Sequence, residues 1–478
     1  MRAFHFLIFS FLISGAVARP ALEKPNIILI FLDDSGYGDF SHTGNPSIHT
    51  PVISRLVREG LNFPQFHTAS GACTASLYSL LTGRNPLRSG FGSWVLSPTA
   101  SRYIHPNEVT IAEGLKNRGY TTGFFGKWHL GNPNANNGNT PNAFPLAHGF
   151  DIWEGTNVSN DYDPGADLIK SDPNGNNPVP GYSMIAEDML NNIPIHENLT
   201  KRYRDRAVSF IQQNKDDPFF LYVAPNMPHL PVYASDEFKG RSLRGLYGDC
   251  IEEIDAMVGT IVETLEGEGI AENTLLIFTS DNGPWIRFQN DANHPKYGEA
   301  RILIGSALPF RDGKGSTWEG GVRVPGVWYW PGTIEEATVV RKPASTFDVL
   351  PTVFALAGES LPTGRTLDGR DIRPYLNSTT FPGAVSDFEF VYTGSPNNRV
   401  YGARKGPWKL HIRLSSQTGN NYGFAASPTN PLLFNVEVDP HERFDRADEE
   451  PEAVSTLQGV IQSFNQSVNS EQTFWGAP

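Results

Sequence analysis

Oxygen-bearing side chains occur in pairs directly after two apolar runs of the sequence. Asp33 and Asp34 follow "NIILIFL", and Asp281 and Asn282 follow "TLLIFTS". One such pair alone is more often a helix cap or a turn, but two pairs that each follow an apolar run favour a shared site. Carboxylate and amide oxygens are the ligands that hard divalent cations prefer. The sequence therefore predicts a site for one Ca²⁺ ion, with Mg²⁺ as the second choice.

Basic side chains occur in three further motifs. Lys127 and His129, in "GKWHLG", are two residues apart and would project to the same side of an extended segment. His229 lies in "NMPHLP", and Lys314 lies between glycines in "RDGKGSTWEGG". Any one of them alone is an ordinary surface or core residue. Together, and beside a metal site, they would form a cationic pocket that fits a tetrahedral oxyanion.

Cys73 opens the segment "CTASLYSLLTGR", which is predicted to form a short apolar helix. A thiol at a helix N-terminus lies close to free backbone amides, which favour an anion and lower the thiol pKa. Two other interpretations stay open. Cys73 is a buried and inert cysteine, or it forms a disulfide bond with Cys250, the one other cysteine of the 478 residues.

Apolar strands alternate with helices along the first 375 residues. Strands are predicted at 26–32, 121–126, 218–224, 274–280 and 323–330, and helices at about 50–59, 73–82, 109–120, 201–214, 246–266 and 345–358. This alternation is typical of an α/β domain with a mostly parallel central sheet and helices on both faces. Such sheets bind their ligands at the carboxyl ends of the strands, where both acidic pairs are expected.

The pattern changes after about residue 375. Short alternating segments joined by Gly, Asn and Pro turns predict a small antiparallel sheet, with strands at 388–393, 399–406, 408–414 and 432–438 and a helix near 452–464. We therefore expect a site-bearing domain at 25–375 and a C-terminal antiparallel-sheet subdomain at 376–478. The Asn-, Gly- and Pro-rich stretches 131–145 and 172–181 are predicted to be surface loops.

The N-terminal segment and the overall charge restrict the compartment and the partners. Arg2 precedes an apolar run that ends in Ala16-Val17-Ala18, which indicates a signal peptide at 1–18 and a secreted, periplasmic or luminal protein. A membrane anchor is the alternative, but the run is short for a span. The net charge of -13 argues against nucleic acid or an anionic membrane as the main partner. Four N-x-[ST] motifs mark candidate glycosylation sites, at Asn157, Asn198, Asn377 and Asn465.

Taken together, the motifs resemble those of the type I sulfatases, the arylsulfatase family of the alkaline-phosphatase-like superfamily. The blocks "DDSGYGD", "LLTGR", "GKWHLG", "PHLP", "TSDNG" and "GKGSTWEGG" match that family in its order, and "LDGRDIRPYL" and "LLFNVEVDPHE" resemble its later blocks. The resemblance covers nearly the whole mature chain. It implies a hydrolase of sulfate esters in which a dedicated maturation enzyme oxidises Cys73 to Cα-formylglycine.

The resemblance also implies a role for each residue of the acidic pairs. Asp33, Asp34, Asp281 and Asn282 would hold Ca²⁺, with the formylglycine at position 73 as a further ligand. The metal would neutralise charge on the transferring group and lower the pKa of the nucleophile. One hydroxyl of the hydrated formylglycine would attack sulfur, and Asp281 could take its proton.

The basic residues receive roles from the same resemblance. Lys127, His229 and Lys314 would bind sulfate oxygens, and His229 or Lys314 would protonate the leaving alcohol. His129 would deprotonate the second hydroxyl of the hydrate, so that sulfate is expelled and the aldehyde returns. Ser159, in "GTNVSND", matches a family position near the sulfate.

The maturation motif departs from the family pattern. The family has Cys-x-Pro-x-Arg, and this chain has Cys73-Thr74-Ala75-Ser76-Leu77. Ala in place of Pro is a mild change, because Pro mainly favours the helix start. Leu77 supplies neither the charge nor the hydrogen bonds of the arginine that the maturation enzyme reads. The chain is therefore a matured enzyme that tolerates the change, a pseudo-sulfatase that binds sulfated glycans without turnover, or an intact sulfatase with one isolated substitution.

The implied substrate is a sulfated carbohydrate or an aryl sulfate. A phosphoester hydrolase of the same superfamily is a further alternative, although the cysteine and the Lys-x-His and Gly-Lys-Gly elements favour sulfate. Three tryptophans are candidates for stacking on sugar rings, although a tryptophan is more often a packing residue: Trp94, Trp153 and Trp285.

Overall fold

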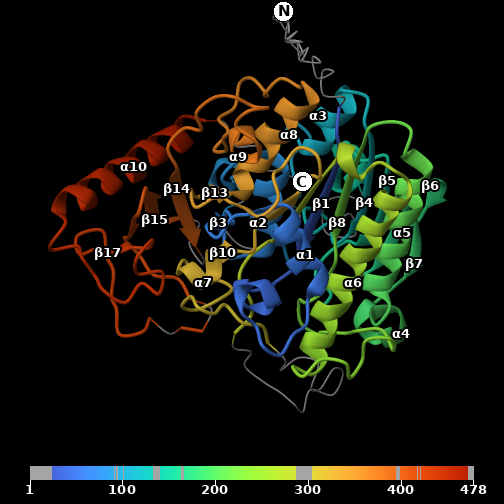
Figure 1. Cartoon of the computed structure of the whole chain (residues 1–478), viewed down its shortest axis with the longest axis horizontal. Helices are drawn as coiled ribbons and strands as arrows, with labels where there is room; N and C mark the ends of the chain where they lie inside the picture. Colours follow the sequence, from blue (N-terminus) through green and yellow to red (C-terminus); the bar gives the residue numbers. More distant parts are fainter. Residues whose placement is uncertain are drawn as a thin grey trace, which may run out of the picture.

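The strand β1, Asn26–Leu32, lies inside a ten-stranded sheet that dominates the computed structural model (Figure 1). The structure describes residues 24–90, 92, 95–100, 102–132, 140–162, 166–286, 304–394, 399–416, 418–419 and 421–471, so that the predicted signal peptide and Trp94 lie outside it. Across the described sheet the strands are ordered β12 (Thr338–Val339), β2 (Leu61–Asn62), β11 (Val327–Tyr329), β9 (Thr274–Ser280), β1, β8 (Phe219–Ala224), β4 (Thr121–Gly126), β5 (Ile152–Thr156), β6 (Leu168–Asn176) and β7 (Pro180–Ala186).

Five adjacent strands, from β9 to β5, are parallel and form the centre of this sheet. β1 pairs with β9 along its whole length, from Asn26 opposite Thr274 to Leu32 opposite Ser280, and with β8 on its other side. β4 continues the same direction between β8 and β5. The carboxyl ends of all five strands therefore meet at one edge. The prediction of a mostly parallel central sheet is confirmed, and antiparallel pairs join this centre on either side.

Helices cover both faces of the sheet. Ile27, Leu29 and Phe31 of β1 belong to one buried apolar cluster, and the alternate residues of the strand belong to a second cluster on the opposite face. Side chains of α2 (Cys73–Thr82), α3 (Ile111–Asn117) and α8 (Val349–Ala357) complete the first cluster, and those of α1 (Pro51–Glu59), α5 (Leu199–Asn214) and α6 (Leu246–Gly267) complete the second (Figure 1). Because each fully buried aliphatic side chain contributes about 1.5–3 kcal/mol, burial of the apolar run 27–32 stabilises β1 in the middle of the sheet.

One loop prediction is wrong. Residues 172–181 were expected to form a surface loop, but they belong to the hairpin of β6 and β7 at the edge of the sheet. The pairing of this hairpin is irregular between Ser171 and Asn176. β7 is the edge strand, and residues 172–176 of β6 extend beyond the pairing with β5, which reaches only Lys170, so this hairpin tolerates the Pro, Gly and Asn residues that the sequence concentrates there. The other predicted loop, 131–145, lies partly outside the described residues.

The C-terminal part forms its own small sheet, as predicted. Its strands are antiparallel in the order β14 (Glu389–Gly394), β15 (Arg399–Lys405), β16 (Trp408–His411) and β17 (Leu432–Asn435), and α10 (Pro451–Ser470) packs on them through Leu457, Ile461 and Phe464. A third sheet joins β10 (Arg323–Val324), β3 (Phe66–His67) and β13 (Ala344–Ser345). The remaining α-helices are single turns, α4 (Ile193–His196), α7 (Glu319–Val322) and α9 (Arg373–Leu376). A domain boundary near residue 375 stays a prediction.

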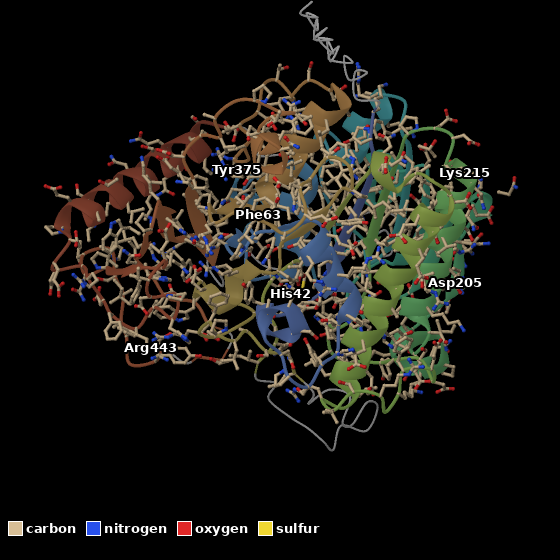
Figure 2. The ribbon with its side chains drawn as sticks, in the orientation of Figure 1. His42, Phe63, Asp205, Lys215, Tyr375 and Arg443 are labelled. Carbon is tan, nitrogen blue, oxygen red and sulfur yellow. The ribbon has the colours of Figure 1, made fainter. Side chains whose placement is uncertain are left out.

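The exposure of the described residues tests the predicted glycosylation sites, and the helices test the alternative of a membrane span. Polar side chains such as Asp205 on α5 and Lys215 just beyond it are exposed (Figure 2). Asn198 and Asn465 are exposed as well, whereas Asn157 is fully buried and is therefore wrong as a glycosylation site. Within the described ranges, each helix is too short or too polar to cross a membrane.

Candidate active site

Four neighbouring strands deliver the predicted site residues to one edge of the sheet. Asp281 follows β9, Asp33 follows β1, and Lys127 follows β4, while His229 lies five residues beyond β8. Cys73 reaches the same place as the first residue of α2. All ten predicted residues are at most 5% exposed, and hydrogen bonds and ion pairs connect most of them. The structure therefore brings the predicted set together in one buried cluster.

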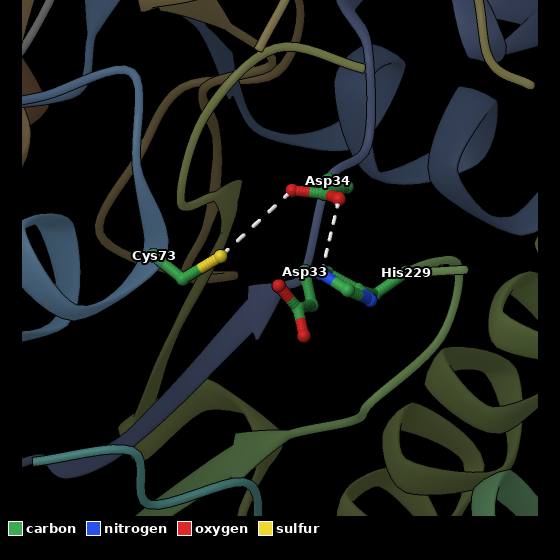
Figure 3. Close-up of side chains that lie close together, drawn as sticks. All are labelled: Asp33, Asp34, Cys73 and His229. Atoms are coloured by element: carbon green, nitrogen blue, oxygen red, sulfur yellow. Dashed lines mark hydrogen bonds and ion pairs between the residues drawn. The ribbon is translucent and has the colours of Figure 1, made fainter. Parts of the chain in front are cut away.

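Asp34 is the centre of this cluster. Its Oδ1 accepts a hydrogen bond of 2.7 Å from the amide Nδ2 of Asn282, and its backbone N–H donates to Oδ1 of Asp281 at 2.9 Å. Its carboxylate also lies 4.0 Å from the Sγ of Cys73 and 3.5 Å from Nε2 of His229 (Figure 3). Asp34 adopts a left-handed backbone conformation with φ of 66°, which is uncommon for a residue other than glycine. The fold thus maintains a strained conformation at the residue where the predicted ligands meet.

The donor set fits a calcium ion. One potential ligand atom from each of Asp33, Asp34, Cys73 and His229 lies within 4.8 Å of the others. Oδ1 of Asp33 and Oδ1 of Asn282 are buried and have no hydrogen-bond partner among the described residues, which is costly for polar atoms unless a cation binds them. Burial, and then the charges of Asp33 and Asp34, raise the pKa of Asp281 well above its usual range. A divalent cation would offset this concentration of negative charge.

Two lysines balance the carboxylates. Nζ of Lys127 lies 2.6 Å from Oδ2 of Asp33 and 3.3 Å from the hydroxyl of Ser159. Nζ of Lys314 lies 2.7 Å from Oδ2 of Asp34 and 3.3 Å from the Sγ of Cys73. Burial acts to lower the pKa of both lysines, but the neighbouring carboxylates outweigh it and raise the pKa of each. Both ammonium groups are therefore charged and directed at the cluster.

His229 and Ser159 close the same side of the cluster. Nε2 of His229 lies 3.3 Å from the hydroxyl of Ser159, and Nδ1 lies 2.7 Å from the backbone carbonyl of Leu230. Because a carbonyl only accepts, Nδ1 carries the hydrogen and Nε2 presents its lone pair to the cluster. Burial, followed by the charges of Lys314 and Lys127, lowers the pKa of His229 well below its usual range. The Ser159 hydroxyl, predicted from the resemblance alone, thus lies between Lys127 and His229.

His129 has a fixed tautomer. It takes a left-handed conformation with φ of 49°, and its Nε2 lies 2.9 Å from the backbone carbonyl of Leu96. The carbonyl accepts, so Nε2 carries the hydrogen, and Nδ1 is buried without a partner among the described residues. Burial and the charge of Lys127 lower the pKa of His129 well below its usual range. A neutral imidazole with a free Nδ1 lone pair is suited to accept a proton.

Thr74 and Tyr162 hold His129 in this state, and the sequence reasoning missed both. The Thr74 hydroxyl donates to the backbone carbonyl of His129 and accepts from the N–H of Leu96, each at 3.0 Å. The Tyr162 hydroxyl donates to the Leu96 carbonyl at 3.0 Å, and its ring contacts that of His129. The position of Thr74 directly after Cys73 was a signal that could have been used. Tyr162 lies in a loop and gave no such signal.

The pKa of the Cys73 thiol differs from the prediction. Cys73 is buried, and burial raises its pKa well above the usual range, outweighing Lys127 and Lys314. The expected lowering by the helix N-terminus is therefore wrong for the unmodified thiol. The alternative of a disulfide bond is also wrong, because Cys73 and Cys250 are both free. An unmodified Cys73 would be a neutral thiol and a poor nucleophile.

Leu77 packs into the core one turn after Cys73. It is 4% exposed and belongs to the apolar cluster that also contains Tyr78 and Leu80. Arg84 and Arg88 do not take the place of the family arginine, because Arg84 pairs with Glu108 and Arg88 pairs with Asp368.

The tryptophans have different surroundings from one another. Trp153 is fully buried among aromatic rings, so it is wrong as a sugar-stacking residue. Trp285 is partly exposed and lies beside the site, with Nζ of Lys314 4.6 Å from its ring centre and His229 against its edge. Of the two candidates that the structure describes, Trp285 is the one beside the cluster.

Comparisons with known proteins agree with this geometry. A model of the sulfatase family matches residues 25–359. The N-acetylgalactosamine-6-sulfatase of Mus musculus is 35% identical over 95% of this chain and 88% of its own length, and arylsulfatase A of Homo sapiens is 37% identical over 90% and 84%. Among solved structures, the PsFucS1 sulfatase from Pseudoalteromonas sp. superposes with a TM-score of 0.79 at 27% identity, covering 95% of this chain and 92% of that one.

Proposed function

This chain belongs to the sulfatase family, and we propose that it is a secreted sulfuric ester hydrolase that acts on a sulfated carbohydrate or an aryl sulfate. The predicted signal peptide supports secretion. The name of the mouse relative, N-acetylgalactosamine-6-sulfatase, makes a 6-sulfated amino sugar the first substrate to test. In this proposal the domain at 25–375 performs the reaction, because it contains every predicted site residue.

The observation that carries the proposal is the position of two charged lysines around the Cys73–Asp34 contact. Lys127, which follows β4, and Lys314, in the loop before α7, meet the carboxylates of Asp33 and Asp34. Such a pair is suited to hold the oxygens of a sulfate group in a site from which water is largely excluded.

The proposed nucleophile is the hydrate of formylglycine at position 73, which offers one hydroxyl for attack and a second one for the release of sulfate. Asp33, Asp34, Asp281 and Asn282 would hold Ca²⁺ beside it, and the ion would neutralise negative charge on the transferring group. Lys127 and Ser159 would orient the sulfate group from one side, because they already contact one another at 3.3 Å.

The protonation states favour Lys314 over His229 as the proton donor to the leaving alcohol. The neighbouring carboxylates keep Nζ of Lys314 protonated, and this ammonium group lies within the cluster, 3.3 Å from the Sγ of Cys73. His229 presents an unprotonated Nε2 toward Asp34 and Ser159, because its Nδ1 hydrogen is committed to Leu230. His229 would therefore orient the Ser159 hydroxyl and the sulfate group.

His129 would act as the base for the second hydroxyl. Its Nδ1 is the one ring atom free to accept a proton, since Nε2 donates to Leu96. Thr74, the residue next to the proposed nucleophile, is hydrogen-bonded to the backbone of His129 and of Leu96. The start of α2 would therefore place both the nucleophile and the base.

The proposal is tested on the peptide that contains Cys73. Trypsin releases Glu59 to Arg84 as one peptide, and mass spectrometry of protein from its native host should show the lighter aldehyde residue at position 73. The same protein should then hydrolyse a sulfated sugar or an aryl sulfate in the presence of Ca²⁺, while the Cys73→Ala variant should not. An unmodified thiol that binds sulfated sugar without turnover would instead establish a pseudo-sulfatase.

A further inference from the structure

The loop that carries Lys314 is attached on one side to the Cys73 segment. The N–H of Gly315 donates to the carbonyl of Gly71 at 2.7 Å, and the N–H of Lys314 donates to the carbonyl of Pro284 at 2.8 Å. The approach to Gly71 is close, because a Cβ atom there would come within 2.9 Å of the carbonyl oxygen of Ser316. The backbone of Lys314 is therefore held against the strand ends and the segment before α2.

The other side of this loop is attached to the C-terminal part of the chain. The hydroxyl of Ser415 donates to the carbonyl of Gly315 at 2.8 Å, and the N–H of Thr317 donates to the carbonyl of Ser415 at 3.4 Å. Gly315, next to Lys314, is thus hydrogen-bonded to Gly71 through its N–H and to Ser415 through its carbonyl.

An aromatic cage holds the start of the same loop. The guanidinium carbon of Arg311 lies 4.9 Å from the ring centres of Trp318 and Tyr422 and 5.0 Å from that of Phe424. Three aromatic rings therefore surround the guanidinium group of Arg311. Tyr422 and Phe424 come from the C-terminal part, and the N–H of Gly320 closes the loop on the carbonyl of Arg311. Cation–π contacts of this kind fix the position of an arginine without a carboxylate.

Buried charges hold the end of the loop as well. The N–H of Glu319, the first residue of α7, donates to the carboxylate of Glu442 at 2.7 Å. Nζ of Lys409, on β16, lies 2.9 Å from the carboxylate of Glu319 and 3.1 Å from that of Glu442. All three side chains are fully buried. Breaking such a network is costly, so it holds the loop firmly to the small sheet.

We propose that Ser415, Tyr422 and Phe424 position the ammonium group of Lys314, so that the C-terminal sheet is part of the catalytic apparatus and not a separate module. The contacts of these residues described above are with the loop that carries Lys314. They act through the Arg311–Thr317 backbone, which places Nζ of Lys314 between Asp34 and position 73. This inference rests on the proposed function for the role of Lys314, and on contacts of the described residues for the role of the C-terminal part.

The first test measures how firmly the loop is held, through hydrogen exchange of its backbone amides. Phe424→Leu removes one ring from the Arg311 cage, and Phe464→Leu is its matched control, because it removes a ring that lies 5.0 Å from Arg88 on another side of the same subdomain. Exchange of the Lys314 and Gly315 amides should become roughly threefold to thirtyfold faster in Phe424→Leu, the range that a lost cation–π contact corresponds to. It should be unchanged in Phe464→Leu. Equal rates in the two variants would overturn the inference.

The second test measures the position of the ammonium group. Titration calorimetry with inorganic sulfate should show a several-fold weaker affinity in Phe424→Leu than in Phe464→Leu. In a Lys314→Met background, Phe424→Leu should have no further effect, because the cage acts only through Lys314. An equal loss in that background would mean that the ring acts on overall structure, and it would overturn the inference.

A second variant and the wild-type protein distinguish a failure of the inference from a failure of the proposed function. Ser415→Ala removes the hydrogen bond to the Gly315 carbonyl without touching the cage, and it should reproduce both effects if Phe424→Leu does not fold. If the wild-type protein binds no sulfate, the proposed function fails, while hydrogen exchange still decides whether the C-terminal part holds the loop.

Discussion

The hydroxyl of Thr74 donates a 3.0 Å hydrogen bond to the backbone carbonyl of His129. Thr74 is the second residue of α2, directly after Cys73, and His129 lies beyond β4, so the contact joins the proposed nucleophile to the proposed base across 55 residues of chain. The same hydroxyl accepts from Leu96, whose carbonyl fixes the tautomer of His129. One side chain therefore contacts both the backbone of the base and the residue whose carbonyl fixes its tautomer.

Thr74→Val should lower turnover by roughly 10- to 100-fold, because the variant keeps the shape of the side chain but releases His129 from its position. It should also lower the free energy of unfolding by about 1–3 kcal/mol, since a buried N–H and a buried carbonyl lose this partner. Thr74→Ser keeps the hydroxyl and serves as the control. The two quantities are measured by steady-state kinetics and urea unfolding. Full activity in Thr74→Val would contradict the role given to this contact.

Lys314→Met should slow the hydrolysis of a sugar sulfate more than that of 4-nitrophenyl sulfate. A sugar alkoxide needs a proton as it leaves, whereas nitrophenolate leaves readily without one. The expected loss for the sugar is about 10²–10⁴-fold in turnover. His229→Gln is the comparison, and it should affect both substrates to a similar degree, because His229 is assigned to orientation. The reverse pattern would identify His229 as the acid.

Ca²⁺ should raise the stability of the protein, and Asp281→Asn should remove most of this gain. At a concentration of 100 times the dissociation constant, one bound ion contributes about 2.7 kcal/mol. Without metal, Asp281→Asn should be more stable than the wild type, because it removes one of three buried carboxylates and keeps the oxygen that accepts from the Asp34 amide. Thermal unfolding with calcium and with a chelator measures both effects. A calcium shift that is the same in both proteins would exclude Asp281 as a ligand.

His196 should make the protein less stable in acid. Its ring stacks on Tyr233 with centres 4.6 Å apart, neither ring nitrogen has a partner among the described residues, and burial lowers its pKa from 6.5 to about 3. Below about pH 6.5 the unfolded chain binds a proton that the folded protein does not, so stability falls as the pH falls through this window. The contribution of His196 between pH 7 and pH 5 is about 2 kcal/mol.

His196→Phe keeps a ring beside Tyr233 and removes the titrating group. In urea unfolding, the variant should lose less stability than the wild type on going from pH 7 to pH 5, and the two should change in parallel above pH 7. An identical acid dependence would mean that other buried histidines, such as His148, account for it.

The acidic half of the site was predictable from the sequence for a simple reason. The segments before Asp33 and Asp281 contain the unbroken apolar runs 27–32 and 275–278, and such a run is typical of a strand buried on both faces. Two such strands in a parallel sheet end at the same edge, and the acids lie near one another because β1 and β9 are neighbours in that sheet. Their pairing in full register along β1 and β9 shows how directly this prediction follows.

The surroundings of the base were not predictable in this way. The Leu96 carbonyl and the Tyr162 hydroxyl reach His129 from loops, where no periodicity fixes direction. The prediction of a lowered pKa for the Cys73 thiol was wrong for a related reason. The sequence shows that Cys73 begins a helix, but it does not show how deeply the thiol is buried. Trp153 likewise reads as a candidate sugar platform until its packing against Phe124 and Phe144 is known. Local patterns predicted the elements, and tertiary contacts decided the chemistry.

Leu77→Arg should raise the fraction of Cys73 that is converted to formylglycine, because it restores the arginine of the family's maturation motif. It should also lower the free energy of unfolding of the folded protein by about 1–3 kcal/mol or more, since Leu77 is 4% exposed in an apolar cluster and a charge there must be desolvated. The conversion is measured by mass spectrometry of the tryptic peptide that contains Cys73. Leu77→Met, which preserves volume and polarity, is the control and should change neither quantity appreciably. If Leu77→Arg is less stable but converted no better than the wild type, the loss of the arginine does not limit maturation, and the Leu77 side chain is simply part of the core.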